Sequence, residues 1–198
     1  MGPALHVIDW PGPGRLATMA HPRGGPWLAD EMAGLASAGV DVFVSALTWE
    51  EDRRLGLTEV AAAAKAAGVE FISFPIADRG VPRAQEIAGL PAGGADIVAL
   101  GVRLAEHVRA GRFVVTQCFA GIGRSTLLAC ATLVLLGVGP QESLRLVAEA
   151  RGLPVPDSDA QRHWLYDFAA AHGDAAASST DPGTGRIIGG HRTGARSF

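Results

Sequence analysis

The strongest constraint on the fold is an alternation of short apolar runs with longer helix-like stretches along most of the chain. The short runs, mostly rich in β-branched or aromatic residues, are typical of strands buried on both faces; they cover residues 5–8, 15–19, 40–47, 69–75 and 113–116. The helix-like stretches cover residues 27–38, 58–67, 96–110, 125–136, 141–150 and 158–171. The first two end at Gly39 and Gly68, which suit the left-handed conformation that closes many helices, and Thr58 is a candidate N-cap.

Strands and helices alternate in the first half of the chain, and helices accumulate in the second. This order predicts an α/β fold in which helices cover both faces of a central, mostly parallel sheet of about four or five strands. With 198 residues, 48% of them hydrophobic, the chain suits one domain with a substantial core, which we expect over residues 1–172. Residues 173–198 are mostly small, polar, glycine or arginine, which predicts a disordered tail.

Composition disfavours several classes of function. The chain has 17 Lys and Arg against 20 Asp and Glu, a formal net charge of −3, so nucleic acid is not an expected partner. The first ten residues lack the basic region and apolar core of a signal peptide, and every long apolar run is interrupted by Gly, Pro or a charged residue. We therefore expect a soluble cytoplasmic protein without membrane contact. Cys118 and Cys130 are expected to be free thiols of a reducing compartment. The six histidines are scattered, and we expect no metal and no cofactor.

One segment carries the chemistry: residues 114–126, VVTQCFAGIGRST, read as a strand, a glycine-containing loop and the start of a helix. Successive N–H groups of such a loop can point at one oxyanion, and the helix N-terminus adds partial positive charge. Gly121 and Gly123 permit the turn. Arg124 can fold back and hold two phosphate oxygens, while the positive field favours the thiolate of Cys118. The segment predicts a phosphate site with a nucleophilic thiol; the alternative is a small core cysteine and a locally paired arginine.

These residues resemble a known family. Residues 118–125, CFAGIGRS, are similar to the signature loop of the cysteine-dependent protein tyrosine phosphatases, in particular the compact dual-specificity-like branch that includes the kinase-associated phosphatases. Residues 74–82, FPIADRGVP, resemble that branch's general-acid loop, with Asp78 at the position of the acid. Weaker similarities lie at residues 41–51, at Arg151-Gly152 and at Gln161, so the resemblance spans about residues 14–171.

The resemblance implies a metal-independent phosphomonoester hydrolase that acts on phosphotyrosine, with phosphoserine and phosphothreonine as further candidates. Cys118 would be the nucleophile, Arg124 the phosphate clamp and Asp78 the general acid and then base. Ser125 would hydrogen-bond the departing thiolate. The positions expected to bind the phosphate are Phe119, Ala120, Gly121, Ile122, Gly123 and Arg124. Three of these, Phe119, Ala120 and Ile122, are uncharged, which favours a phosphorylated protein or a small phosphomonoester over inositol polyphosphates.

The motif departs from the family at one position, where Gln117 precedes the cysteine in place of the usual histidine. Glutamine can donate hydrogen bonds but carries no charge, so we expect a reduced rate. This departure leaves a second hypothesis, a catalytically weak or dead module that binds phosphate or phosphopeptide. A third, a sulfurtransferase or arsenate reductase, shares the cysteine loop, but Cys130 lies about one and a half turns along the next helix and is badly placed as a resolving thiol.

Other positions support weaker expectations. Gln161 could position the hydrolytic water, but an ordinary surface glutamine on an amphipathic helix is the simpler interpretation. Arg79, beside Asp78, fits either a second anionic group of the substrate or a solvated charge. The mixed-sign run at residues 50–54 is expected to be a solvent-facing loop, and residues 88–94 a simple connection.

Overall fold

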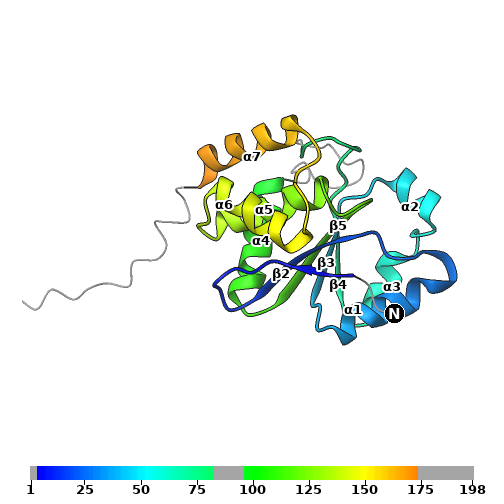
Figure 1. Cartoon of the computed structure of the whole chain (residues 1–198). Helices are drawn as coiled ribbons and strands as arrows, with labels where there is room; N and C mark the ends of the chain where they lie inside the picture. The colour runs from blue at the N-terminus through cyan, green and yellow to red at the C-terminus, as the bar shows by residue number, and fades with distance from the viewer. Residues whose placement is uncertain (1–3, 83–95, 174–198) are drawn as a thin grey trace, which may run out of the picture.

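A computed structural model describes residues 4–82 and 96–173, and its centre is a five-stranded sheet in the order β1-β2-β5-β3-β4 (Figure 1). The strands are β1 (His6–Val7), β2 (Arg15–Ala20), β3 (Val42–Ser45), β4 (Glu70–Ser73) and β5 (Phe113–Cys118). β1 is antiparallel to β2, and all other neighbours are parallel. β5 is central and every one of its residues is buried. Its carboxyl end therefore delivers the next loop to the middle of the sheet edge, where ligands bind in parallel α/β sheets.

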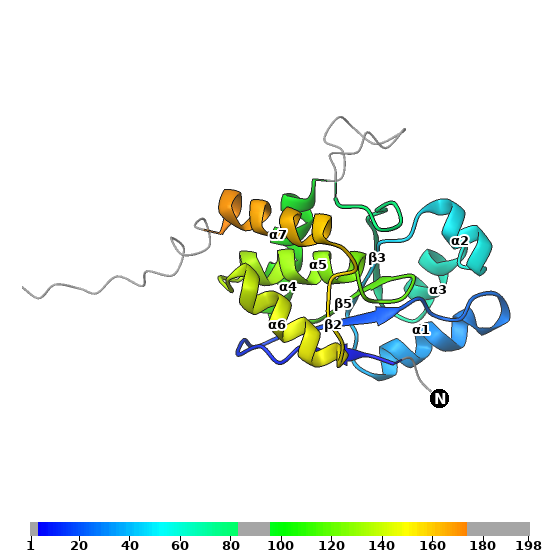
Figure 2. The same ribbon diagram turned by 45° about the horizontal axis from the view of Figure 1, so that its top comes forward.

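Helices cover both faces of the sheet, as the second view in Figure 2 shows. They are η1 (Gly25–Trp27), α1 (Leu28–Ser37), α2 (Trp49–Leu55), α3 (Val60–Ala66), α4 (Ile97–Arg109), α5 (Arg124–Leu135), α6 (Pro140–Arg151) and α7 (Asp159–His172). Side chains of α4 to α7 share one core with Val44 and Val114, and those of α1 and α3 share another with Phe43 and Val115. Since neighbouring residues of a strand point to opposite faces, the sheet separates the two cores.

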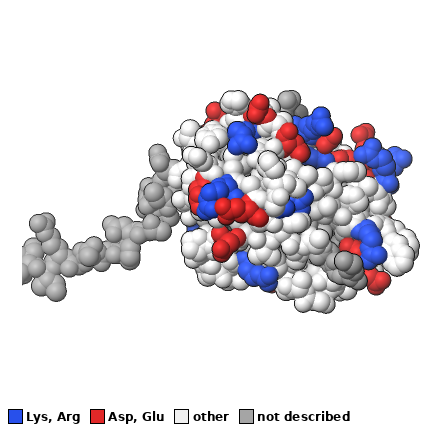
Figure 3. All heavy atoms as spheres, viewed as in Figure 1, with Lys and Arg blue, Asp and Glu red and all other residues white. Residues whose placement is uncertain are grey.

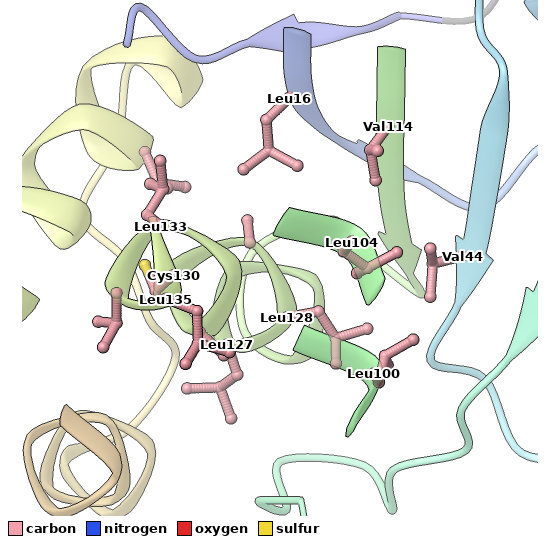
Figure 4. Packing of buried hydrophobic residues seen from close by; sticks show 14 of the residues in the cluster. Leu16, Val44, Leu100, Leu104, Val114, Leu127, Leu128, Cys130, Leu133 and Leu135 are labelled. Atoms are coloured by element: carbon pink, nitrogen blue, oxygen red, sulfur yellow. The ribbon is translucent and has the colours of Figure 1, made fainter. Parts of the chain in front are cut away.

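α5 is the centre of the larger core. All twelve of its residues are buried, because β5, α4, α6 and α7 surround it. Figure 4 shows Leu127, Leu128 and Leu133 extending from this helix, with Leu104 of α4 on the side of Leu128. Truncating one such leucine to alanine typically costs about 2–5 kcal/mol of folding free energy. The N-terminus of α5, where the phosphate site is expected, is thus anchored in the larger core.

The predicted α/β class, the mostly parallel sheet and the helices on both faces are confirmed. Two local predictions are wrong. The run at residues 50–54 is not a loop but lies within α2, because Thr48 and Glu51 form a reciprocal capping box that starts a helix there. Thr58 is not an N-cap: α3 begins two residues later, with Glu59 at its N-cap position and no side-chain cap.

Two further predictions lie outside the described residues, namely the connection at residues 88–94 and the tail beyond residue 173. In the part of the chain that the structure describes, no helix has the length and apolarity needed to cross a membrane. Charged side chains of both signs share the face viewed in Figure 3, often in mixed groups. On α6, for example, Arg145 pairs with both Glu142 and Glu149.

Candidate active site

The cysteine loop connects the central strand to the central helix: β5 ends at Cys118 and α5 begins at Arg124. Gly121 is required in this loop for two reasons. Its φ of 72° is a left-handed conformation, and a Cβ there would lie 2.6 Å from the carbonyl carbon of Met19. The loop therefore turns directly against the backbone at the end of β2, which fixes its path.

Cys118 is buried, and its Sγ lies 3.4 Å from Ser125 Oγ in the first turn of α5. The carbonyl of Ser125 in turn accepts a hydrogen bond of 2.9 Å from Thr116 Oγ1, which ties the helix start to β5. Above the thiol, Phe119 and Ala120 are exposed, and the Phe119 ring packs against His21. Arg151, at the end of α6, donates to the carbonyl of Ala120 at 3.1 Å and holds this exposed half of the loop.

Arg124 is buried and bonded on one side of its guanidinium. Nη1 donates to Glu51 Oε2 at 2.7 Å and to the carbonyl of Ile76 at 3.0 Å, while Nη2 donates to Glu51 Oε1 at 2.8 Å. Burial opposes the charge of Arg124, but the hydrogen bonds and charge of Glu51 outweigh it, so the pKa of Arg124 is raised. Burial likewise opposes the charge of Glu51, but bonds from Arg124 and Thr48 keep its pKa below the usual value. Both partners stay ionised, so the Arg124 guanidinium keeps its charge although it is buried.

Glu51 is the site residue that the sequence reasoning missed. Thr48 Oγ1 accepts from the Glu51 N–H, and Glu51 Oε2 accepts from the Thr48 N–H at 2.9 Å, so the helix cap itself orients the carboxylate. The far end of α2 is also fixed, because the Gly25 N–H donates to the carbonyl of Gly56 at 2.8 Å. The available signal was the Thr48-x-x-Glu51 spacing, which marks a capping box.

The Asp78 loop approaches from the other side of the arginine. Asp78 Oδ1 lies 3.4 Å from Arg124 Nη2, and its side chain is 76% exposed. The first half of the loop is bonded to the end of β3, since Phe74 N–H donates to Ser45 and Ile76 N–H donates to Ala46. A cavity of about 420 Å³ lies beside the loop; its lining residues are Thr48, Glu50, Glu51, Arg54, Ala77, Asp78 and Phe119. A substrate in this cavity can contact both the cysteine loop and the carboxylate.

Several solved structures share this fold. Kinase associated phosphatase, crystallised with its catalytic-site cysteine replaced by serine, superposes with a TM-score of 0.71 at 17% identity over 90% of this chain and 98% of that one. The fold is that of the protein tyrosine phosphatases. PTPMT1 in complex with PI(5)P gives a TM-score of 0.64 at 20% identity over 81% and 94% of the two chains, and Tk-PTP in its active form gives 0.57 at 22% over 86% and 99%. No family's sequence model matches the chain, and neither does any curated protein.

On this phosphatase fold, Gln117 is buried but faces away from the thiol, as neighbouring residues of a strand must. Its Nε2 donates to Ser45 Oγ, and its Oε1 has no partner among the described residues. Arg79 is exposed with a φ of 53°, and its guanidinium bonds to no other described residue. Cys130 is fully buried in α5, and burial raises the pKa of its thiol, so it is not a reactive group.

Gln161, the remaining candidate, is not the surface residue that the simpler interpretation expected. It is fully buried in the first turn of α7, following the Ser158 N-cap. Its Nε2 donates to the carbonyl of Gly80 at 3.0 Å, and its Oε1 accepts from the Asp157 N–H at 3.1 Å. Gln161 thus contacts the loop that carries Asp78.

Proposed function

We propose that the protein is a metal-independent phosphomonoester hydrolase of the protein tyrosine phosphatase type. The observation that carries this proposal is the placement of Arg124, which joins the cysteine loop to the acid loop. Its guanidinium sits at the end of the loop that starts at Cys118, and its Nη2 lies 3.4 Å from Asp78 Oδ1. Arg124 thus connects the segment of the nucleophile to that of the proton donor, and Asp78 and Phe119 line one cavity beside them. In-line phosphoryl transfer requires that such groups be positioned together.

Arg124 has spare donors for a phosphate. A guanidinium has five N–H groups, and Nη1 already donates to Glu51 and Ile76, while one N–H of Nη2 donates to Glu51. We expect the Nε–H and the second Nη2–H to hold two equatorial oxygens bidentately, with the loop amides bonding the others. The edge of the guanidinium formed by Nε and Nη2 is thus left for the substrate.

In the first step, the Cys118 thiolate attacks phosphorus, an S–P bond forms and the bond from phosphorus to the ester oxygen breaks. Asp78 gives its proton to that leaving oxygen. In the second step, Asp78, now a carboxylate, takes a proton from water as the water oxygen attacks phosphorus and the S–P bond breaks. Ser125 Oγ, 3.4 Å from the sulfur, is placed to hydrogen-bond the thiolate that departs. The products are an alcohol and inorganic phosphate.

The substrate we propose is a phosphotyrosyl protein or a small aryl phosphate, with phosphoserine and phosphothreonine as slower substrates. The loop positions Phe119 and Ala120 that face outwards carry no charge, and Phe119 offers an aromatic surface beside the cavity. PTPMT1 was crystallised with a phosphoinositide, so PI(5)P is the comparison substrate. Faster turnover of PI(5)P than of a phosphotyrosyl peptide would overturn this preference.

A phosphate-binding module without turnover is the second candidate. The observation that favours it is Gln117, whose buried Oε1 has no partner in the part of the chain that the structure describes and whose side chain cannot supply the charge of a histidine. Against it, Cys118, Asp78 and Ser125 serve no purpose in a protein that only binds.

The deciding experiment measures hydrolysis of para-nitrophenyl phosphate in the presence of a chelator, with and without vanadate. We expect chelator-resistant, vanadate-sensitive turnover that Cys118→Ser abolishes and that Asp78→Asn lowers about 100-fold, within the range for a lost general acid. Folded wild-type protein that binds phosphate but does not turn over would establish the binding module.

A further inference from the structure

The loop that carries Asp78 is attached to the protein differently on its two sides. Before the aspartate, its backbone is bonded to β3 through Phe74 and Ile76, and the Ile76 carbonyl accepts from Arg124. After the aspartate, Arg79 adopts a φ of 53°, an uncommon conformation for a residue with a side chain, and the Gly80 N–H bonds back to Ala77 within the loop. The described residues from Asp78 to Pro82 need another attachment to keep the carboxylate in place.

Gln161 supplies that attachment. Its side chain is fully buried, and its Nε2 donates to the carbonyl of Gly80 at 3.0 Å. Gly80 lies two residues after Asp78 in the same loop. Because its Oε1 accepts from the Asp157 N–H, the amide cannot rotate without losing two hydrogen bonds. The side chain thus connects the start of α7 to the acid loop in one fixed orientation.

The same amide adjoins the cysteine loop. A Cβ on Gly123, the N-cap of α5, would lie 2.9 Å from Gln161 Oε1 and 2.0 Å from Asp157 Oδ2. Gln161 therefore lies between the segment that binds the phosphate and the segment that protonates the leaving group. Any shift of one of these segments along this contact is transmitted to the other, because the interior is closely packed.

We propose that Gln161 is a positioning residue for the general acid: through Gly80 it holds Asp78 where it can protonate the leaving oxygen. This proposal rests on the proposed function and differs from a role in holding the hydrolytic water. A water-holding glutamine acts only after the S–P bond has formed, whereas a residue that positions Asp78 already acts in the first step, while the ester bond breaks.

Two variants separate these roles. Gln161→Glu keeps an acceptor for the Asp157 N–H but replaces the donor to Gly80 with an oxygen, and Gln161→Met keeps the size but removes both bonds. Gln141→Glu, the same substitution at an exposed position of α6, is the matched control. The readout is kcat/KM for dinitrophenyl phosphate, whose leaving group needs little protonation, and for phenyl phosphate, whose leaving group depends on it.

In both Gln161 variants we expect kcat/KM to fall about tenfold for phenyl phosphate and less than about threefold for dinitrophenyl phosphate. Asp78→Asn should change the two values in the same direction but by more. Gln141→Glu should match wild type on both. Since each ratio compares two substrates on one preparation, it does not depend on the folded fraction. Equal losses on both substrates, unchanged kinetics, or a fall in kcat with kcat/KM intact would overturn the proposal. Failure of wild-type protein to hydrolyse dinitrophenyl phosphate would instead overturn the proposed function.

Discussion

Arg124 and Glu51 show how single residues set the chemistry of this site. The guanidinium is 3% exposed and the carboxylate 9%, so neither charge is solvated and each depends on the other. The spacing between Cys118 and Arg124 predicts a phosphate clamp, but it does not reveal a carboxylate 73 residues away that orients the clamp. That partner emerges only when α2 is folded against the end of the sheet.

Glu51→Gln tests this dependence. Gln can keep one hydrogen bond to Arg124 but removes the charge, so we expect the free energy of unfolding to fall by about 3 kcal/mol. Loss of guanidinium orientation should lower kcat/KM for para-nitrophenyl phosphate at least about tenfold. Urea unfolding and steady-state kinetics measure the two effects. Glu106→Gln, at an exposed position of α4 away from the cavity, is the control, and equal behaviour of the two variants would contradict this role of Glu51.

Asp52, the next residue, is held in an unfavourable environment. Burial and then the charge of Glu51 raise its pKa from 3.8 to about 6, and its Oδ1 has no partner among the described residues. Between these two pH values the unfolded state is ionised while the folded state keeps its proton, so stability falls as pH rises through this window. The destabilisation caused by Asp52 is absent below this window and complete above pH 6.

Asp52→Asn should therefore raise the free energy of unfolding at pH 8 by about 1 kcal/mol, a value reduced for partial solvent screening, and should change it little at pH 4. Urea titrations at several pH values measure the difference. Asp167→Asn, at an exposed position of α7, should leave the pH dependence unchanged. A stabilisation of Asp52→Asn that is equal at pH 4 and pH 8 would show that ionisation is not its cause.

At the scale of elements, the sequence predicts features that depend on neighbouring residues, such as helix starts. It does not predict contacts between elements that are far apart in the chain. The Asp96 and Ser158 N-caps lie where the sequence places the starts of α4 and α7. α2 was missed because its charged residues mimic a solvated loop, although Thr48 and Glu51 contain the cap signal. The burial of Gln161 is not predictable from its neighbours in sequence, because it depends on a contact with Gly80, 81 residues away.

Gly121→Ala tests how closely the cysteine loop approaches β2. Alanine at this position is strained by the left-handed φ, and its Cβ would lie 2.6 Å from the Met19 backbone. Gly111→Ala is the matched control, because its φ of 83° is also left-handed but no atom of the described residues lies within 4 Å of the added Cβ. We expect about 1 kcal/mol of destabilisation at Gly111 with normal activity, and a loss of activity of about 100-fold or more at Gly121. Equal activity of the two variants would contradict a loop path fixed by β2.

For the whole molecule, the two thiols are both buried but lie in different parts of one domain. Cys118 ends the central strand at the start of the cysteine loop, whereas Cys130 is enclosed within α5, where burial raises its pKa (Figure 4). The α/β class and this separation of roles follow from the alternation of segments and from the glycine loop. The depth of Cys130 follows from the packing of α4, α6 and α7 around α5.

Alkylation with iodoacetamide should consequently modify one thiol in the native protein, at Cys118, and two after unfolding in denaturant. Vanadate or phosphate should slow the native reaction, because the anion covers the thiol. Peptide mapping by mass spectrometry locates the label. Native labelling of Cys130 at a similar rate would contradict the burial of that thiol.

The measurement that tests the central claim most directly is the capture of the covalent intermediate. Wild-type protein is mixed with dinitrophenyl phosphate, quenched in acid within the first turnovers and digested, and the phosphate is located by mass spectrometry. We predict phosphate on the peptide that contains Cys118, at its thiol, and none after Cys118→Ser. Steady turnover with the phosphate on another residue, or turnover that persists in Cys118→Ser, would contradict the account.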